Sequence, residues 1–238
     1  DQMTDHNYLV SNGTGNTKYF TVNKSIYKNC YTTTSCVISV PNNDSFFGNL
    51  GMSPVEKDRI YVGYQQAVYR SEDAGSNWSA IGTASGNWCL AVGRNVGTVY
   101  AAGDGITGQR LFRLYYPSST WSNITPPAPY DNQLKITDIE IDPLDINHVY
   151  ISVGGTNANA KVFMTSNAGN TWTNLSFNLP NVPIFCIKKD INHGLYVGTS
   201  IGVFYKPPGY LHWQHFSNNL PPVPVTEIEL WPEPYPVN

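Results

Sequence analysis

Charged side chains are scarce in this chain. Asp, Glu, Lys and Arg make up 13% of its 238 residues, against roughly 25% in an average soluble domain. The 14 basic residues are outnumbered by 17 acidic ones, so the chain lacks the basic excess that attracts nucleic acid or an anionic membrane. Long apolar runs are missing too, since none approaches the ~20 residues that a membrane-spanning helix needs. We therefore expect neither a nucleic-acid partner nor a transmembrane segment.

The first residues of the given sequence do not have the pattern of a leader. The chain does not begin with a basic stretch followed by an apolar one, and its first residue is Asp rather than Met. We expect that any secretion signal has been removed and that the chain is a mature or excised piece of a longer protein. Aromatic residues, by contrast, make up 13% of the chain, which is too many for a disordered segment.

Cysteines are few, and the four of them fall into two kinds. Cys30 and Cys36 lie in the polar stretch KNCYTTTSC. We predict that they form a structural disulfide, which implies an oxidising compartment; two unpaired thiols are the alternative. Cys89 and Cys186 lie in the apolar contexts WCLAV and FCIKK and are predicted to be small buried hydrophobic residues. No second Cys/His pair has the spacing of a zinc site, so no metal and no cofactor is expected.

The chain does contain an internal repeat centred on tryptophan. Residues 68–78 read VYRSEDAGSNW and residues 162–172 read VFMTSNAGNTW, and the two align without a gap. Two weaker copies occupy residues 111–121 and 203–213. The period of about 40–50 residues is typical of a repeat architecture. The four copies end at Trp78, Trp121, Trp172 and Trp213.

Two β-rich segments precede each copy. The nearer one reads RIYVGY, TVYAAG, HVYISV or GLYVGT, and the farther one reads FGNLGMSP, WCLAVGR, ITDIEIDP or IFCIKKD. Together with a strand before each Trp and another after it, each unit contains four short strands linked by turns. This pattern predicts an all-β fold, a β-propeller of four-stranded antiparallel blades. A β-sandwich is the alternative, but it gives no reason for one Trp in a fixed frame of each unit.

We place about four full blades, plus partial ones, in residues 46–238. The full blades are expected at about 46–85, 86–131, 132–180 and 181–222, and residues 223–232 are expected to form the first strand of a further blade. Residues 1–45 are either a partial blade or an insertion that contains the Cys30–Cys36 disulfide. Four blades is at the low end for a closed ring, which favours a larger propeller or one closed by the N-terminal segment.

The tryptophan copies resemble a known motif. The stretch SEDAGSNW, from Ser71 to Trp78, resembles the Asp-box or BNR repeat, S-x-D-x-G-x-T-W, and Thr165 to Trp172 is a second match in which Asn167 replaces the Asp. The resemblance covers about residues 46–231. It implies the β-propeller superfamily of the sialidases, the xyloglucanase-type glycoside hydrolases and the sortilin-like receptors. The overall style is similar to that of secreted, Bacteroidetes-like bacterial repeat proteins.

Turn chemistry explains the residues that recur in the box. Asp73 is expected to accept backbone N–H bonds inside the turn, and Gly75 and Gly169 are expected to supply a positive φ. Trp78 and Trp172 are expected to bury a large apolar surface between neighbouring blades. We therefore interpret eight residues as structural Asp-box residues: Ser71, Asp73, Gly75, Trp78, Thr165, Asn167, Gly169 and Trp172.

Two carboxylates are the candidate catalytic residues. Asp138 and Glu227 are the only acids in one frame of the expected first strands, and Glu140 and Glu229 lie two residues further on. Two carboxylates at a suitable separation can hydrolyse a glycosidic bond; the alternative is solvated charge along a channel or a strand edge. Asp142-Pro-Leu-Asp145 is interpreted as a proline turn, because it lacks the pattern of a calcium loop.

Aromatic side chains are the candidate ligand-binding residues. Trp88, Tyr64 and Trp231 could each offer a stacking surface for a sugar or a peptide, although core packing is the usual role of such residues. From the sequence we favour a non-catalytic extracellular module that binds a glycan or a protein, alongside other domains of the same polypeptide or a surface complex. The alternatives are a xyloglucanase-like glycoside hydrolase and a sortilin-like peptide receptor.

Overall fold

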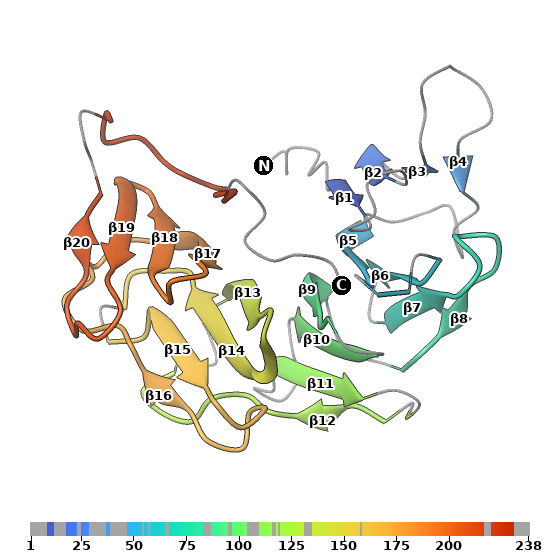
Figure 1. The fold of residues 1–238 in the computed structure, drawn as a ribbon, viewed down its shortest axis with the longest axis horizontal. Coiled ribbons are helices and arrows are strands. Elements are labelled where there is room, and N and C mark those ends of the chain that lie inside the picture. Colours follow the sequence, from blue (N-terminus) through green and yellow to red (C-terminus); the bar gives the residue numbers. More distant parts are fainter. Residues whose placement is uncertain are drawn as a thin grey trace. The chain divides into compact units, whose positions relative to one another are not determined.

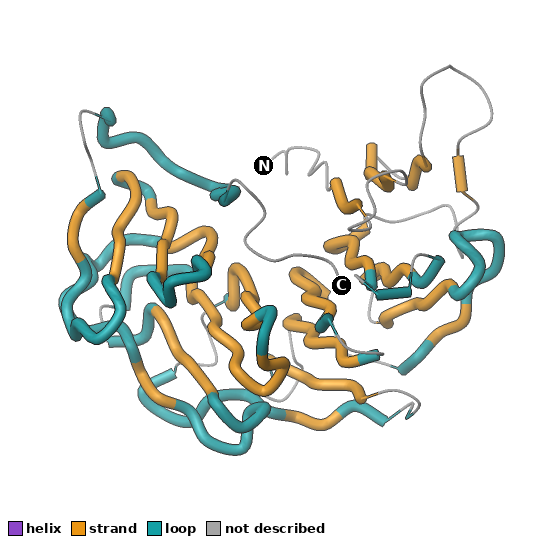
Figure 2. Tube along the Cα trace, in the orientation of Figure 1, coloured by secondary structure: helices purple, strands orange, loops and turns teal. Residues whose placement is uncertain are grey.

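The computed structural model of the chain is built from β-strands (Figure 1). It describes residues 9–11, 18–22, 25–28, 37–38, 47–53, 55–56, 58–64, 67–82, 87–94, 97–103, 110–115, 118, 120–130, 135–157, 159–216 and 220–230. Among these residues, all regular secondary structure is β-strand (Figure 2). None of them belongs to a helix long and apolar enough to cross a membrane. The prediction of an all-β fold is confirmed.

The strands form four-stranded sheets in which neighbours in the chain pair with one another. The first sheet comprises β1 (Leu9–Ser11), β2 (Lys18–Val22), β3 (Ser25–Lys28) and β4 (Val37–Ile38). The second comprises β5 (Phe47–Met52), β6 (Ile60–Tyr64), β7 (Ala67–Ser71) and β8 (Ser79–Ala80). The third comprises β9 (Asn87–Val92), β10 (Thr98–Gly103), β11 (Leu111–Tyr115) and β12 (Ser122–Asn123). The fourth comprises β13 (Ile136–Asp142), β14 (Asp145–Val153), β15 (Val162–Thr165) and β16 (Thr173–Asn174). The fifth comprises β17 (Ile184–Lys189), β18 (Leu195–Thr199), β19 (Gly202–Lys206) and β20 (Gln214–His215).

The chain divides into two compact units. The first contains Asp1–Ile106 and Phe112–Asn123, and the second contains Thr107–Leu111 and Ile124–Pro236. Within the first unit β5 lies beside β9, and within the second unit β13 lies beside β17. These four are the first strands of their sheets, so successive sheets within a unit approach one another at their first strands. This is the arrangement of innermost strands in propeller blades.

The core of each unit lies between successive sheets, because strand alternation gives each sheet apolar side chains on the face that it packs. In the second unit, Ile187, Leu195, Val197 and Trp213 of the fifth sheet region pack against Val162, Leu175 and Leu179 of the fourth. In the first unit, Leu90, Val99, Ala101, Phe112 and Leu114 pack against Tyr61, Val68 and Ile81. Ile26 of β3 packs with Leu50, Met52, Ile60 and Val62 of the second sheet. Each of these three clusters thus lies between two successive sheets of one unit, as in repeat proteins.

Each of the four predicted units holds one four-stranded sheet. The two ends of the chain differ from the four predicted units. Within residues 1–45, β1–β4 form a sheet of their own; these strands are short, and residues 1–45 contain no Trp. The described part of the expected strand at 223–232 forms no strand. Prolines at 221, 222 and 224 lack a backbone N–H, and Val225 N donates a single bond, to Thr199 O.

Candidate functional site

The turn from Ser71 to Trp78 is a closed network of short-range hydrogen bonds. Ser71 Oγ donates to Asp73 Oδ1 (2.8 Å) and accepts from Gly75 N (2.8 Å). Asp73 Oδ1 also accepts from Asn77 N (2.8 Å), and Asp73 Oδ2 accepts from Asn77 Nδ2 (2.6 Å). These bonds lower the pKa of Asp73 to about 2, with the Asn77 side chain as the largest cause. The carboxylate therefore serves as an acceptor inside its own turn.

The turn from Thr165 to Trp172 repeats this geometry with an amide in place of the carboxylate. Thr165 Oγ1 donates to Asn167 Oδ1 (3.0 Å) and accepts from Gly169 N (2.9 Å). Asn167 Oδ1 accepts from Thr171 N (2.8 Å). The charge of the third residue is thus dispensable for the fold of the turn, whereas its acceptor oxygen is retained in both copies.

Both turns use two consecutive residues with positive φ. Gly75 (φ 93°) and Gly169 (φ 92°) have the left-handed conformation that the sequence predicted, and so do Ala74 (φ 58°) and Ala168 (φ 56°), which it did not. The alanine N–H explains the strain: Ala74 N donates to Asp58 O (2.8 Å) and Ala168 N to Asn147 O (2.9 Å). The first box is thereby attached to the connection between β5 and β6, and the second box to the beginning of β14.

Three of the repeat tryptophans donate an indole hydrogen bond to a backbone carbonyl earlier in the chain. The indole Nε1 of Trp121 donates to Ile81 O (2.7 Å), that of Trp172 to Ile124 O (2.9 Å) and that of Trp213 to Leu175 O (2.8 Å). Each acceptor is the residue directly after an outer strand, and the two residues of each pair lie in the same unit. We name this repeated contact the Trp latch. Of the two predicted box tryptophans, Trp172 forms this contact, and Trp78 packs against the apolar cluster of the second sheet.

Asp138, the first candidate acid, lies on β13 beside β17. Its Oδ1 accepts from Ile139 N (2.8 Å), and its Oδ2 accepts from Ile187 N of β17 (3.0 Å). Two residues on, Glu140 Oε1 accepts from Lys189 N (3.4 Å). The N–H groups of Ile187 and Lys189 point away from β18, so without these carboxylates they would form an open strand edge. Asp138 and Glu140 therefore cap the edge of the neighbouring first strand.

Lys188 lies among these carboxylates. Its Nζ is 3.3 Å from Glu140 Oε2 and 3.9 Å from Asp138 Oδ2. Burial raises the pKa of Glu140, against the opposing effect of the Lys188 charge. Burial alone would lower the pKa of Lys188, but Glu140 and Asp138 outweigh it and raise that pKa. The three side chains form a partly desolvated charge cluster, which we call the inner cluster.

Glu227, the second candidate acid, is exposed and lies on the segment that follows the fifth sheet. Burial, followed by the charge of Asp138, raises the pKa of the Cys186 thiol to about 11, and Glu227 adds to the rise. Glu229 acts in the same way on Lys188. Asp138 and Glu227 therefore both lie close enough to β17 to influence it. The sequence did not single out Lys188, although a Lys pair inside the apolar stretch IFCIKKD was a signal for it.

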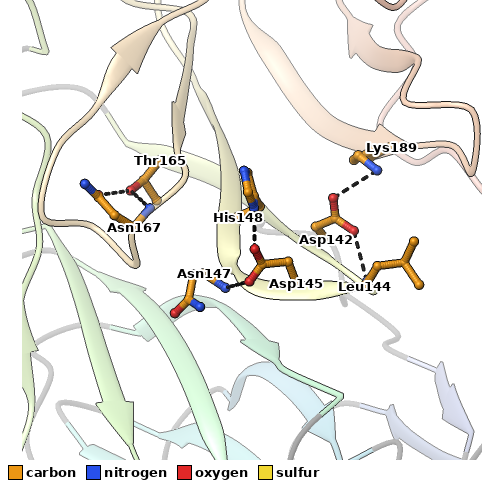
Figure 3. A network of polar contacts seen from close by, with 8 residues as sticks. All are labelled: Asp142, Leu144, Asp145, Asn147, His148, Thr165, Asn167 and Lys189. Carbon is orange, nitrogen blue, oxygen red and sulfur yellow. Dashed lines mark hydrogen bonds and ion pairs between the residues drawn. The ribbon is translucent and has the colours of Figure 1, made fainter.

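Asp142 at the end of β13 and Asp145 at the start of β14 both bond to nearby groups (Figure 3). Asp142 Oδ1 accepts from Leu144 N (3.0 Å), and Asp142 Oδ2 lies 3.0 Å from Lys189 Nζ. Asp145 Oδ1 accepts from Asn147 N (2.9 Å), and its Oδ2 contacts His148 Nδ1 (2.7 Å). The bond from Asn147 N is the main reason that the pKa of Asp145 is lowered. Across the described residues, no group of three or more His, Cys, Asp or Glu side chains could hold a metal ion.

A buried lysine links the fourth sheet to the segment that enters the fifth. Lys161 is fully buried, and its Nζ donates to Gly155 O (2.6 Å) and Val182 O (2.8 Å). Burial lowers the pKa of Lys161. The two backbone acceptors compensate the buried ammonium, and they tie the loop after β14 to the crossing segment before β17. The sequence offered no signal for this role.

Several predicted residues cannot be placed in the site. Tyr64 and Trp88 belong to β6 and β9, but their side chains lie outside the described part of the structure. Trp231, Cys30 and Cys36 lie outside the described residues altogether. Cys89 and Cys186 are buried free thiols, as predicted.

Comparison with known proteins bears on the fold. No protein-family model and no curated protein sequence matches the chain. The GH74 enzyme of Niastella koreensis is 17% identical, with a TM-score of 0.66 over 89% of this chain and 37% of that one. The extracellular domain of a one component system of B. thetaiotaomicron is 14% identical, with a TM-score of 0.67 over 92% of this chain and 29% of that one. A chain of a nidogen/laminin complex is 9% identical, with a TM-score of 0.67 over 88% of this chain and 79% of that one.

The four-stranded sheets, the repeated turns and these likenesses define a β-propeller chain. At identities this low, the likeness concerns the fold alone. The chain spans 37% of the GH74 enzyme and 29% of the B. thetaiotaomicron domain.

Proposed function

We propose that the chain is a non-catalytic propeller module that binds a glycan or a protein, within a larger secreted or cell-surface protein. The observation that carries the proposal is the bonding of Asp138. Both of its oxygens accept backbone N–H bonds, one within β13 and one from β17. A carboxylate committed to two backbone donors has a structural role, and it is poorly placed to exchange a proton with a substrate.

The kind of ligand is inferred from what propellers of this fold are used for. The similar solved structures include GH74 enzymes, one of them a xyloglucanase, an extracellular domain and a chain of a nidogen/laminin complex. These proteins suggest extracellular work on carbohydrate or protein. The choice between the two ligand classes stays open, and a sortilin-like peptide receptor belongs to the protein-binding alternative.

The test combines binding and hydrolysis on the same purified chain. A glycan array and a panel of peptides report binding, and reducing-sugar release from xyloglucan and other plant or animal polysaccharides reports hydrolysis. We expect binding to one ligand class without sugar release. Asp138→Asn removes the inner-strand carboxylate, and Asp145→Asn, in the turn between β13 and β14, is the matched control. Sugar release that Asp138→Asn abolishes and Asp145→Asn retains would overturn the proposal.

A glycoside hydrolase is the second candidate, and one observation favours it. Asp138 is half-buried and accepts two backbone hydrogen bonds, whereas Glu227 is exposed, and the charges of both reach Cys186 of β17. Carboxyl groups in contrasting environments are the usual arrangement of a general acid and its partner. In this alternative Asp138 and Glu227 act as the catalytic pair. Glu227→Gln and Asp138→Asn would then each abolish hydrolysis while leaving the unfolding midpoint within a few degrees of the parent.

A further inference from the structure

The Trp latch recurs with a fixed local geometry. Ile81, Ile124 and Leu175 each follow an outer strand, and each donates its backbone N–H to the third strand of its own sheet: to Val68 O, Leu111 O and Val162 O, respectively. The carbonyl of each of these residues then accepts the indole N–H of a tryptophan that follows in the chain. The first bond fixes the position of the acceptor residue, and the second holds the indole of the following tryptophan against its carbonyl.

Phe216 is the fourth member of this series and has only the first bond. Phe216 N donates to Val203 O (2.8 Å), as the other three members do within their sheets. No donor among the described residues reaches its carbonyl. The Phe216 side chain is 42% exposed, whereas Ile81 and Leu175 are buried. The last sheet therefore presents a latch acceptor without its tryptophan.

The surface around Phe216 repeats an interface that is already formed. In the fourth sheet, Tyr150, Val162, Met164 and Leu175 face the apolar residues of the fifth. Their equivalents in the fifth sheet are Tyr196, Val203, Tyr205 and Phe216, which we call the terminal face. Tyr196, Tyr205 and Phe216 form one aromatic cluster, with ring centroids 4.6 Å, 5.8 Å and 6.2 Å apart. Phe204 lies on the opposite side of β19 and packs into the core.

The segment that would supply the first strand of an additional sheet lies beside the fifth sheet. Val225 N donates to Thr199 O (2.9 Å), and a side chain at Gly198 would collide with Val225 O. Residues 225–230 align with 184–189 of the fifth unit. Lys188 contacts Glu140 on one side (3.3 Å), and Glu229 adds a favourable charge from this segment. Position and charge both match those of a following first strand.

We propose that the terminal face docks a further four-stranded sheet of the same repeat, whose first strand is residues 225–230 and whose tryptophan donates to Phe216 O. The chemistry of the partner is defined by the interface that it copies: an apolar sheet face with one indole N–H. The inference does not depend on whether the module is catalytic. Closure of the face by another part of this chain, and pairing of two chains through it, are alternatives that the experiment separates.

The first experiment uses the 238-residue chain and the substitution Phe216→Asp. Phe177→Asp is the matched control, because Phe177 is similarly exposed (47%) and lies outside the terminal face. We expect Phe216→Asp to reduce the binding of an apolar dye, with an unfolding midpoint close to that of the control and a monomer in light scattering throughout. A large loss of midpoint for Phe216→Asp alone would mean that this chain covers the face itself. A parent dimer that Phe216→Asp dissociates would assign the face to a second copy. Either result overturns the proposal.

The second experiment supplies the missing sheet. Residues 1–230 are followed by a second copy of residues 190–222, so that 225–230 become the first strand of a complete unit containing its own Trp. We expect loss of dye binding and an unfolding midpoint higher by about 4 °C or more. The same extension with Trp213→Phe in the added copy, or with Phe216→Asp in the original sheet, should give a smaller rise. An extension that leaves dye binding and midpoint unchanged, or that proteases remove, overturns the proposal.

Discussion

At the residue scale, Asp73 and Asn167 show what the third position of the box requires. Asp73 Oδ1 accepts from Asn77 N, and Asn167 Oδ1 accepts from Thr171 N, at 2.8 Å in both cases. Aspartate and asparagine share that acceptor oxygen and differ in charge and in the second polar atom. The oxygen that closes the turn is therefore the retained feature, and the charge is a property of one copy only.

Asp73→Asn should preserve the fold and weaken the acid dependence of stability. The pKa of Asp73 is about 2 in the folded chain, below its ordinary value of 3.8. A depressed pKa means that the carboxylate stabilises the fold above pH 3.8 and that this stabilisation is lost as the pH falls through about 2. Urea unfolding at several pH values between 5 and 2 measures the free energy of unfolding. This free energy should therefore fall less steeply with decreasing pH for Asp73→Asn than for the parent.

The reciprocal variant Asn167→Asp serves as the control. It places a carboxylate in the second box. In the parent, Asn167 Nδ2 donates to Thr171 Oγ1; in the variant, the Thr171 hydroxyl can donate to the new carboxylate instead. Between pH 4 and 2, the free energy of unfolding of this variant should fall more steeply with decreasing pH than that of the parent. Equal slopes for the parent and both variants would show that the lowered pKa of Asp73 is not linked to folding.

At the element scale, the Trp latch combines apolar burial with one hydrogen bond. Trp213 is 3% exposed, packs among Leu175, Ile187 and Val197, and donates to Leu175 O. Trp213→Ala should cost about 3–5 kcal/mol of unfolding free energy, because it opens a large cavity. Trp213→Phe keeps most of the apolar contact and loses the donor, so it should cost about 1–3 kcal/mol. Urea denaturation measures both, and a Trp213→Phe variant as stable as the parent would exclude a contribution from the hydrogen bond.

A second link between sheets is the ion pair of Asp142 and Lys189. The two side chains are 10% and 2% exposed, and Nζ lies 3.0 Å from Oδ2. Removing one partner of a buried pair leaves an uncompensated charge, so Lys189→Met should destabilise the chain by about 3–5 kcal/mol. Asp142→Asn keeps the acceptor for Leu144 N. The double variant should therefore recover most of the loss in a double-mutant cycle, and additive losses would show that the two charges do not interact.

The elements that sequence reasoning identified are those with a local signature. The Trp-centred copies located four sheets, because the box is a turn whose bonds join residues two to four positions apart. For residues 1–45 the sequence left a partial blade and an insertion as alternatives, since the strands β1–β4 are short and lack a Trp. The roles of Lys188 and Lys161 could not be predicted either. Their partners are 48 and 21 residues away, and they meet only when one sheet packs beside the next.

The candidate site illustrates the same limit. The shared frame of the first strands singled out Asp138 and Glu227, and both influence Cys186 of β17. That Asp138 caps the N–H of Ile187 depends on the spacing between two first strands, which no single-strand pattern contains. A carboxylate in a strand therefore has two meanings, catalysis or edge capping, that only the neighbouring strand distinguishes.

At the scale of the whole molecule, the reactivity of the four cysteines tests both the burial of the core and the predicted disulfide. Cys89 and Cys186 are 2% and 5% exposed. Burial, followed by the charge of Asp138, raises the pKa of Cys186 to about 11, so almost no reactive thiolate is available at neutral pH. Cys30 and Cys36 are predicted to be joined in a disulfide, as suits an extracellular protein. All four cysteines should therefore resist alkylation in the folded chain, for two different reasons.

Alkylation with iodoacetamide and intact mass measurement separates these reasons. The folded, unreduced chain should take up no label at neutral pH. After unfolding in urea without a reductant, Cys89 and Cys186 should be labelled, and after reduction all four cysteines should be. The variant Cys36→Ser should expose Cys30 to labelling in the folded chain, whereas Cys186→Ser should leave the folded chain unlabelled. Labelling of Cys30 and Cys36 without reduction would mean that the disulfide is absent, and the argument for an oxidising compartment would lose its covalent support.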